Sequence, residues 1–194
     1  MILFLAGAAG GCSKKEAGLL PLPFQDDFER EALGAAWQGE AEWKIVNGEL
    51  FSAGTENRPL WLRAALPERV TVEFDARSQS PDGDIKFEIF GDGKRHASGY
   101  ILIFGGWKNT ISCIARLDEH GADRLEKRER GLVQPEKTYH MKVVAEGKEL
   151  LWYIDGQLFL RYFDAQPLRG PGHDRFAFNN WRSPLYFDNL VINP

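Results

Sequence analysis

The chain has 194 residues, of which 43% are hydrophobic and 27% charged, and its formal net charge is -4. This length and composition fit one soluble globular domain with a hydrophobic core, and they exclude a disordered chain. The acidic balance argues against a nucleic-acid partner, because binding to phosphates needs clustered Lys and Arg side chains.

The N-terminus has the character of an export signal. Residues 2–10 are all apolar or small, a run too short to span a membrane, which takes about 20 residues. Residues 9–12, Ala-Gly-Gly-Cys, resemble the lipobox of bacterial lipoproteins, in which cleavage before the cysteine makes it a lipidated N-terminus. The alternative is an apolar N-terminus with an unmodified Cys12.

The lipobox resemblance implies a division of the chain and a location. We expect a lipoprotein signal peptide over 1–11, a lipidated tether over 12–23 and a folded domain over 24–194. The protein would then be anchored in the bacterial cell envelope, outside the cytoplasm. Ser13 after Cys12 resembles the signal for the outer membrane, should the cell be Gram-negative.

From residue 24 onward the dominant hydrophobic period is two, which is typical of β-strands. Asn47-Gly48 and Asp155-Gly156 each separate two apolar runs and predict tight hairpins. A short helix is predicted only within 29–37. Strands are predicted within 43–51, 60–66, 69–77, 84–93, 100–104, 110–117, 139–145, 150–163, 175–179 and 185–192. This number of short strands predicts an all-β fold, a sandwich of two antiparallel sheets.

Several segments also resemble a known family. The segments "WKIVNGELFSA", "FDARS", "LLWYIDGQLFLRYFD" and "FDNLVI" are similar to concanavalin A-like lectin/glucanase jelly rolls. They look most like the bacterial group related to 3-keto-disaccharide hydrolases and laminin-G-type modules. The resemblance implies a jelly roll that commonly meets carbohydrate, and it does not by itself imply catalysis.

A catalytic site is only partly present. Laminarinase-type glucanases of this superfamily carry Glu-x-Asp-x-x-Glu on one strand. Here Glu73 and Asp75 match, but Ser78 stands at the third acidic position. Glu88 on a neighbouring strand is a candidate replacement, since retaining hydrolysis needs two carboxyls about 5 Å apart. The alternative, which we favour, is that these acids form a salt-bridged polar face and that the protein is not an enzyme.

The sequence shows no metal or cofactor motif of defined spacing. Calcium is the one ion considered: Asp27 opens the domain and Asp188 lies near its end, and residues 81–84 form another oxygen-rich turn. The alternative reading of these acids is as turn and strand-end residues. Cys113 alternates in phase with apolar residues, so an inert buried thiol is expected.

Aromatic residues in loops are the candidates for ligand contact. Trp107 follows two glycines, and Asn180, Trp181 and Arg182 follow a predicted strand. Indole rings beside amide and guanidinium groups suit the C–H faces and hydroxyl edges of sugars. The alternative is that both tryptophans cap the ends of the core.

These features leave a choice of functions. We expect a lipid-anchored envelope protein whose jelly roll binds carbohydrate or another envelope protein. The alternative is a glycoside-cleaving enzyme of the 3-keto-disaccharide hydrolase type.

Overall fold

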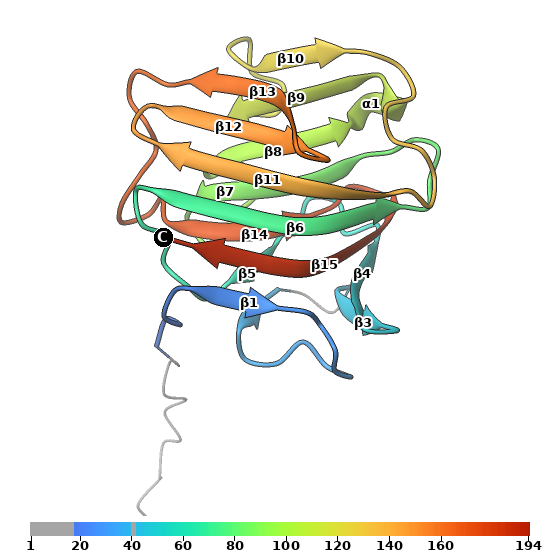
Figure 1. Ribbon diagram of the computed structural model, residues 1–194, viewed down its shortest axis with the longest axis horizontal. Coiled ribbons are helices and arrows are strands. Elements are labelled where there is room, and N and C mark those ends of the chain that lie inside the picture. Colours follow the sequence, from blue (N-terminus) through green and yellow to red (C-terminus); the bar gives the residue numbers. More distant parts are fainter. Residues whose placement is uncertain (1–17, 40–41) are drawn as a thin grey trace, which may run out of the picture.

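The computed structural model describes residues 18–39 and 42–194 and shows two β-sheets packed face to face (Figure 1). The predicted signal peptide and Cys12 lie outside the described residues. In Figure 1, β6 and β11 lie in front of β7 and β8, and the space between the two layers holds the core. Within the described part of the chain, no helix is long and apolar enough to cross a membrane.

Both sheets are antiparallel throughout. The eight-stranded sheet contains, in spatial order, β13 (Gln157–Phe163), β12 (Glu149–Ile154), β11 (Thr138–Glu146), β6 (Val70–Ser78), β15 (Pro184–Asn193), β4 (Glu49–Ala53) and β3 (Lys44–Val46), and β1 (Phe24–Asp26) also pairs with β15. The seven-stranded sheet contains β10 (Leu125–Arg128), β9 (Ile111–Arg116), β8 (Tyr100–Gly105), β7 (Ile85–Gly91), β14 (Arg175–Asn179), β5 (Leu60–Leu62) and β2 (Trp37–Gln38). The predicted all-β sandwich is therefore confirmed.

Both predicted hairpins form, each with a two-residue turn in which a glycine and the residue before it adopt left-handed backbone conformations. Asn47 and Gly48 have φ values of 54° and 79°, and Asp155 and Gly156 have 49° and 77°. Positive φ at both central residues gives the turn that matches the twist of the flanking strands. These turns fix the register of β3 with β4 and of β12 with β13.

The core follows from the alternation predicted for β6. Val70, Val72, Phe74 and Ala76 are buried, whereas the residues between them are partly exposed. The Phe74 ring lies 4.9 Å from Phe87 and 5.2 Å from Phe178, both in the opposite sheet, in edge-to-face contacts. Aromatic side chains thus join the two layers.

The predicted helix within 29–37 is wrong, because this segment forms an irregular loop around Asp26. The buried Asp26 carboxylate accepts hydrogen bonds from Arg30 Nη2 at 2.7 Å and from Trp37 Nε1 at 2.8 Å. Those bonds draw both ends of the segment toward one strand end, and Gly34 has a φ of 74° that a helix does not allow.

The predicted tether touches the domain before residue 24. Leu20 forms a parallel bridge with Ala64, and its backbone N–H donates to the Arg63 carbonyl at 2.7 Å. Leu20 and Leu22 also pack against the core. The short strands β1, β2 and β10 were not predicted, since two to four residues carry too little alternation to be recognised.

Candidate functional site

A hollow of about 830 Å³ opens on the outer face of the seven-stranded sheet, beside the start of β7. Its floor includes Lys86 of β7 and Ile103 of β8, which are cross-strand neighbours. Loops from five parts of the chain form its walls. The lining residues are Asn57, Ser80, Asp82, Asp84, Lys86, Ile103, Trp107, Lys108, Glu119, His120, Trp181, Arg182 and Ser183.

The loops bury a face of β7 that an ordinary strand would expose to water. Ile85, Phe87 and Ile89 point into the core, so Lys86 and Glu88 point outward, yet these two are only 2% and 0% exposed. Such burial of charged groups is costly unless each is paired. Polar partners from the covering loops provide the pairing.

Lys86 and Glu119 form the ion pair in the floor of the hollow. Lys86 Nζ donates to Glu119 Oε2 and to Asn57 Oδ1, both at 2.9 Å. Although burial alone would raise the pKa of Glu119, the charge and hydrogen bond of Lys86 lower it below its usual value. Glu119 therefore remains an ionised carboxylate with its charge matched.

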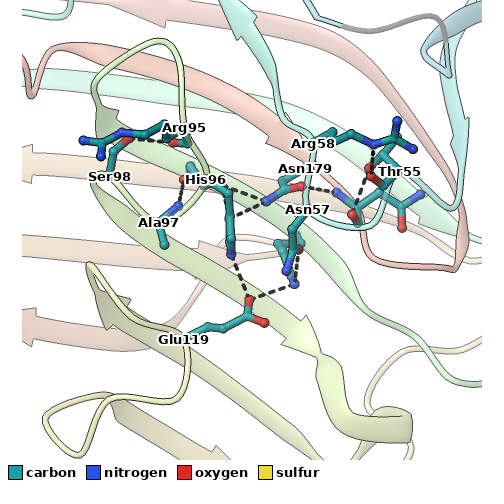
Figure 2. Close-up of polar contacts among 12 residues, drawn as sticks. Thr55, Asn57, Arg58, Arg95, His96, Ala97, Ser98, Glu119 and Asn179 are labelled. Carbon is teal, nitrogen blue, oxygen red and sulfur yellow. Dashed lines mark hydrogen bonds and ion pairs between the residues drawn. The ribbon is translucent and has the colours of Figure 1, made fainter.

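Glu88 anchors a second polar group next to this pair. Its carboxylate contacts His96 Nδ1 at 2.7 Å and accepts hydrogen bonds from the Ala97 N–H at 3.0 Å and from Asn179 Nδ2 at 2.7 Å. In Figure 2, His96 and Glu119 point toward each other, with His96 Nε2 lying 3.6 Å from Glu119 Oε2. The two groups together tie three covering loops to β7 and β14.

Trp107 lies in a left-handed turn, α1 (Gly106–Asn109), with φ values of 50° at Trp107 and 58° at Lys108. Left-handed backbone is unfavourable for side chains other than Gly and Asn, so the turn must be held by its surroundings. Gly105 has a φ of 68°, and a Cβ there would lie 2.5 Å from Val133 Cγ2. Asn109 completes the anchor, donating to the Val133 carbonyl at 2.6 Å.

The Trp107 indole is half-buried and lines the hollow. It packs against a small apolar cluster on the outer face of the sheet: Ile101, Ile103, Cys113 and Ala115. The Arg124 guanidinium lies 4.7 Å from the ring centre, and the His120 ring meets the indole edge-on at 5.7 Å. Trp107 thus does not cap the main core, contrary to the alternative interpretation of the sequence.

Asp84 is a partly exposed acid that lines the hollow. It has a φ of 68°, and its backbone N–H donates to the Gly105 carbonyl at 2.9 Å. Its carboxylate accepts no hydrogen bond from any residue in the described ranges, whereas Glu88 and Glu119 are both satisfied. Burial raises the pKa of Asp84 to about 6, with Lys86 opposing and Glu119 adding to the increase.

The turn at residues 180–183 contributes two of its three predicted ligand residues to the hollow. Trp181 is 42% exposed on the rim, and Arg182 beside it donates to Glu56 Oε1 at 2.8 Å. The prediction of Asn180 as a ligand residue is wrong, because its side chain is fully buried. Its amide donates to the Ser183 carbonyl at 2.7 Å and to the Ser52 carbonyl at 3.1 Å. It fixes the turn and does not reach the hollow.

The candidate catalytic acids lie on opposite sides of the molecule. Glu73 and Asp75 face outward from the eight-stranded sheet, where His140 contacts them at 3.3 Å and 2.9 Å. Glu88 faces outward from the seven-stranded sheet, so it cannot replace the acid missing at Ser78. The chain crosses between sheets after β6, which separates the candidate Glu88 from the other two acids.

The calcium candidates do not form a cluster of ligands. Asp27 accepts a hydrogen bond from the Glu29 N–H, and Asp188 accepts one from the Asn189 N–H. Among the residues described, no three His, Cys, Asp or Glu side chains are grouped to hold a metal ion. Asp84, from the oxygen-rich turn at 81–84, instead lines the hollow.

Cys113 is buried in the small apolar cluster behind Trp107. Burial raises the pKa of its thiol to about 12. The thiol therefore stays protonated near neutral pH, which agrees with the expected inert residue and leaves no nucleophile at this position.

The sequence did not identify Lys86 or Glu119 as site residues, and it offered Asp84 only as part of the oxygen-rich turn at 81–84. Alternation along 84–93 predicts Lys86 on the outward face of its strand, but nothing local shows that loops cover that face. Glu119 lies 33 positions from Lys86. A lysine alternating with core residues on a strand is the only local signal, and most such lysines are exposed.

The fold has well-matched relatives among carbohydrate-active proteins. No family model matches the chain. Carbohydrate-binding module CBM66 of Bacillus subtilis superposes with a TM-score of 0.68 at 18% identity, covering 84% of this chain and 98% of that one. A non-specific endo-beta-1,3(4)-glucanase of family GH16 superposes with a TM-score of 0.60 at 12% identity, covering 87% and 92%. The fold is thus a concanavalin A-like jelly roll, as the sequence predicted.

One curated relative is similar in sequence. An extracellular exo-alpha-L-arabinofuranosidase of Streptomyces chartreusis is 22% identical over 142 residues, which are 73% of this chain. The matched region is 17% of the length of that enzyme.

Proposed function

We propose that this chain is a carbohydrate-binding module that acts outside the cytoplasm and holds a glycan in the hollow beside β7. The observation that carries the proposal is that one hollow holds both the half-buried Trp107 indole and the Asp84 carboxylate, which accepts no hydrogen bond from the residues that the structure describes. The volume of about 830 Å³ lies within the range of small-molecule sites.

The chemistry of the lining suits a sugar. An indole covers the apolar C–H face of a pyranose or furanose ring, and amide, carboxylate and ammonium groups bind the hydroxyl edges. Asn57, Asp84 and Lys108 line the same hollow as Trp107. Support also comes from the shared jelly-roll fold of a carbohydrate-binding module and from the distant likeness to part of an arabinofuranosidase.

Binding without cleavage is the function that the geometry supports. Glu88, the candidate for the missing third acid, lies on the outer face of the other sheet from Glu73 and Asp75, so it cannot act with them on one glycosidic bond. Product analysis after incubation with arabinan, laminarin and 3-keto glycosides tests this point. Released sugars would favour the glycoside-cleaving alternative.

Trp107→Ala is expected to weaken glycan binding about tenfold, because the apolar area of a partly covered indole contributes about 1–2 kcal/mol. The indole also packs on the small apolar cluster, so we expect the substitution to lower the free energy of unfolding by about 1–2 kcal/mol. Replacing a core tryptophan with alanine costs more, roughly 3–5 kcal/mol. Isothermal titration with arabinan and laminarin, together with thermal melting, measures both effects.

Phe163→Ala is the matched control for Trp107→Ala. Phe163 is an aromatic residue that is 62% exposed on edge strand β13 of the other sheet. Its removal should change neither affinity nor melting. If Trp107→Ala keeps its fold and binds glycan with unchanged affinity, Trp107 does not contact the ligand.

We further propose that Cys12 carries the lipid that anchors the module to the envelope. The support is the sequence of residues 9–12 after an apolar run. Cys12→Ala should lose labelling by a fatty-acid probe and leave the membrane fraction, whereas Cys113→Ala should keep both properties. A Cys12→Ala protein that stays labelled and membrane-bound would contradict the lipid anchor.

A further inference from the structure

We propose that Asp84 is the hydroxyl-accepting anchor of the hollow and that it selects neutral glycosyl residues with two adjacent free hydroxyls. This inference rests on the proposed function, because it names the sugar chemistry that the same hollow takes. An ionised carboxylate has two oxygens that together accept hydrogen bonds from a vicinal diol.

The first support is the contrast between Asp84 and two other acids on this face of the sheet, Glu88 and Glu119. Glu88 accepts from a backbone N–H and an asparagine amide, and Glu119 accepts from Lys86. Asp84 has a backbone hydrogen bond but no donor to its carboxylate among the described residues. Asp84 is partly exposed in the hollow, so its acceptor oxygens are open to the hydroxyl donors of a ligand, which would replace water there.

The second support is the link between Asp84 and the turn that carries Trp107. The Asp84 N–H donates to the Gly105 carbonyl at 2.9 Å, and a Cβ on Gly106 would lie 3.3 Å from Asp84 Oδ1. The carboxylate and the indole are therefore held by adjoining backbone. A sugar that places its C–H face on Trp107 would present hydroxyls toward Asp84.

The third support is the charge around Asp84. Lys86 faces it from β7 but is already bonded to Glu119 and Asn57, and Arg182 on the rim is paired with Glu56. Asp82, Lys108 and His120 also line the hollow. With the paired charges set aside, Asp82 and Lys108 balance each other, so the charge of Asp84 is left over and an anionic sugar would add a like charge.

Burial raises the pKa of Asp84 to about 6, which gives binding a defined dependence on pH. Only the ionised carboxylate accepts from two hydroxyls, and that form predominates above pH 6. Acidification to pH 5 should therefore weaken binding about tenfold relative to pH 7.5, through protonation of this one group.

The test compares Asp84→Asn with the matched control Asp155→Asn. Both positions have positive φ, 68° and 49°, which asparagine tolerates, and both substitutions remove one negative charge. Asp155 lies in the β12–β13 hairpin of the other sheet. Titrations use arabinan, laminarin, O-methylated arabinan and polygalacturonate, each at pH 7.5 and pH 5.0.

We expect the unmodified chain and Asp155→Asn to bind arabinan or laminarin at pH 7.5 and to weaken at pH 5.0. Asp84→Asn should bind the same polysaccharide about 10- to 100-fold more weakly at pH 7.5 and lose the pH dependence. O-methylated arabinan and polygalacturonate should bind at least tenfold more weakly than the neutral polysaccharide.

The outcomes separate the two proposals. Tight binding by the unmodified chain, unaffected by Asp84→Asn, would overturn the role of Asp84 and leave carbohydrate binding intact. Preferred binding of polygalacturonate, or stronger binding at pH 5.0, would also overturn it. Failure of the unmodified chain to bind any of the four polysaccharides would overturn the proposed function itself.

Discussion

Lys86→Met is expected to lower the free energy of unfolding by about 3 kcal/mol at pH 7.5, because it leaves the Glu119 carboxylate in the hollow without its cation. The Lys86 side chain is 3% exposed and that of Glu119 is 14% exposed, so water replaces little of the lost interaction. Urea unfolding followed by tryptophan fluorescence measures the change.

Acid titration distinguishes this pair from a simple packing defect. The pKa of Glu119 is lowered in the folded protein from its usual value of 4.5 by Lys86. A lowered folded pKa contributes stability above the unfolded value, and that stability is lost as the pH falls through the folded pKa. The deficit of Lys86→Met should therefore shrink as the pH falls below about 4.5.

Two controls accompany Lys86→Met. The double variant with Glu119→Gln should recover part of the loss, because no unpaired charge remains. Lys142→Met removes an exposed lysine that pairs with Glu73 on the other sheet, and it should change stability by less than about 0.5 kcal/mol. A Lys86→Met loss no larger than that of Lys142→Met would show that the floor pair is not a buried ion pair.

Asp84→Asn is expected to stabilise the folded chain by about 2 kcal/mol at pH 7.5. The folded pKa of Asp84 is about 6 and its ordinary value is 3.8. A raised folded pKa favours folding below the unfolded value, and this advantage is lost as the pH rises through the folded pKa. The difference between these two pKa values sets an upper bound of about 3 kcal/mol on the gain in stability. Contact with solvent in the hollow makes the gain smaller than this bound.

Unfolding of Asp84→Asn and the unmodified chain at several pH values tests that prediction. The difference between them should be largest above pH 7 and should approach zero below about pH 3, where Asp84 is protonated in both the folded and unfolded states. A destabilised variant at pH 7.5 would mean that Asp84 holds the fold together. If Asp84→Asn gains stability and loses glycan binding, Asp84 serves ligand binding at a cost in stability.

Local sequence signals predicted the frame of the molecule. Asn47-Gly48 and Asp155-Gly156 determined two hairpins, and the alternation from Val70 to Ala76 determined the inward face of β6. These features depend on neighbours within a few residues, which is why one sequence was enough to predict them.

The site was predicted only in part, because it depends on which sheet each strand joins. Alternation showed that Glu73 and Glu88 point away from the core, but it did not show that β6 and β7 belong to different sheets. Asn180 was expected in a binding turn, yet that turn packs against Ser52, 128 positions away. Trp107 was found because two glycines before a tryptophan mark an unusual turn, whereas the loops that cover Lys86 follow from long-range contacts.

The most direct measurement is an NMR titration of the ¹⁵N-labelled chain with arabinan-derived and laminarin-derived oligosaccharides. Carbohydrate binding in the hollow predicts shifts at the Trp107 indole N–H and at the amides of Asp84, Lys108 and His120, which line it. The amides of Glu73, Asp75 and His140, on the outer face of the other sheet, should not move. Shifts confined to those three residues, or no shifts with any oligosaccharide, would contradict the hollow as the carbohydrate site.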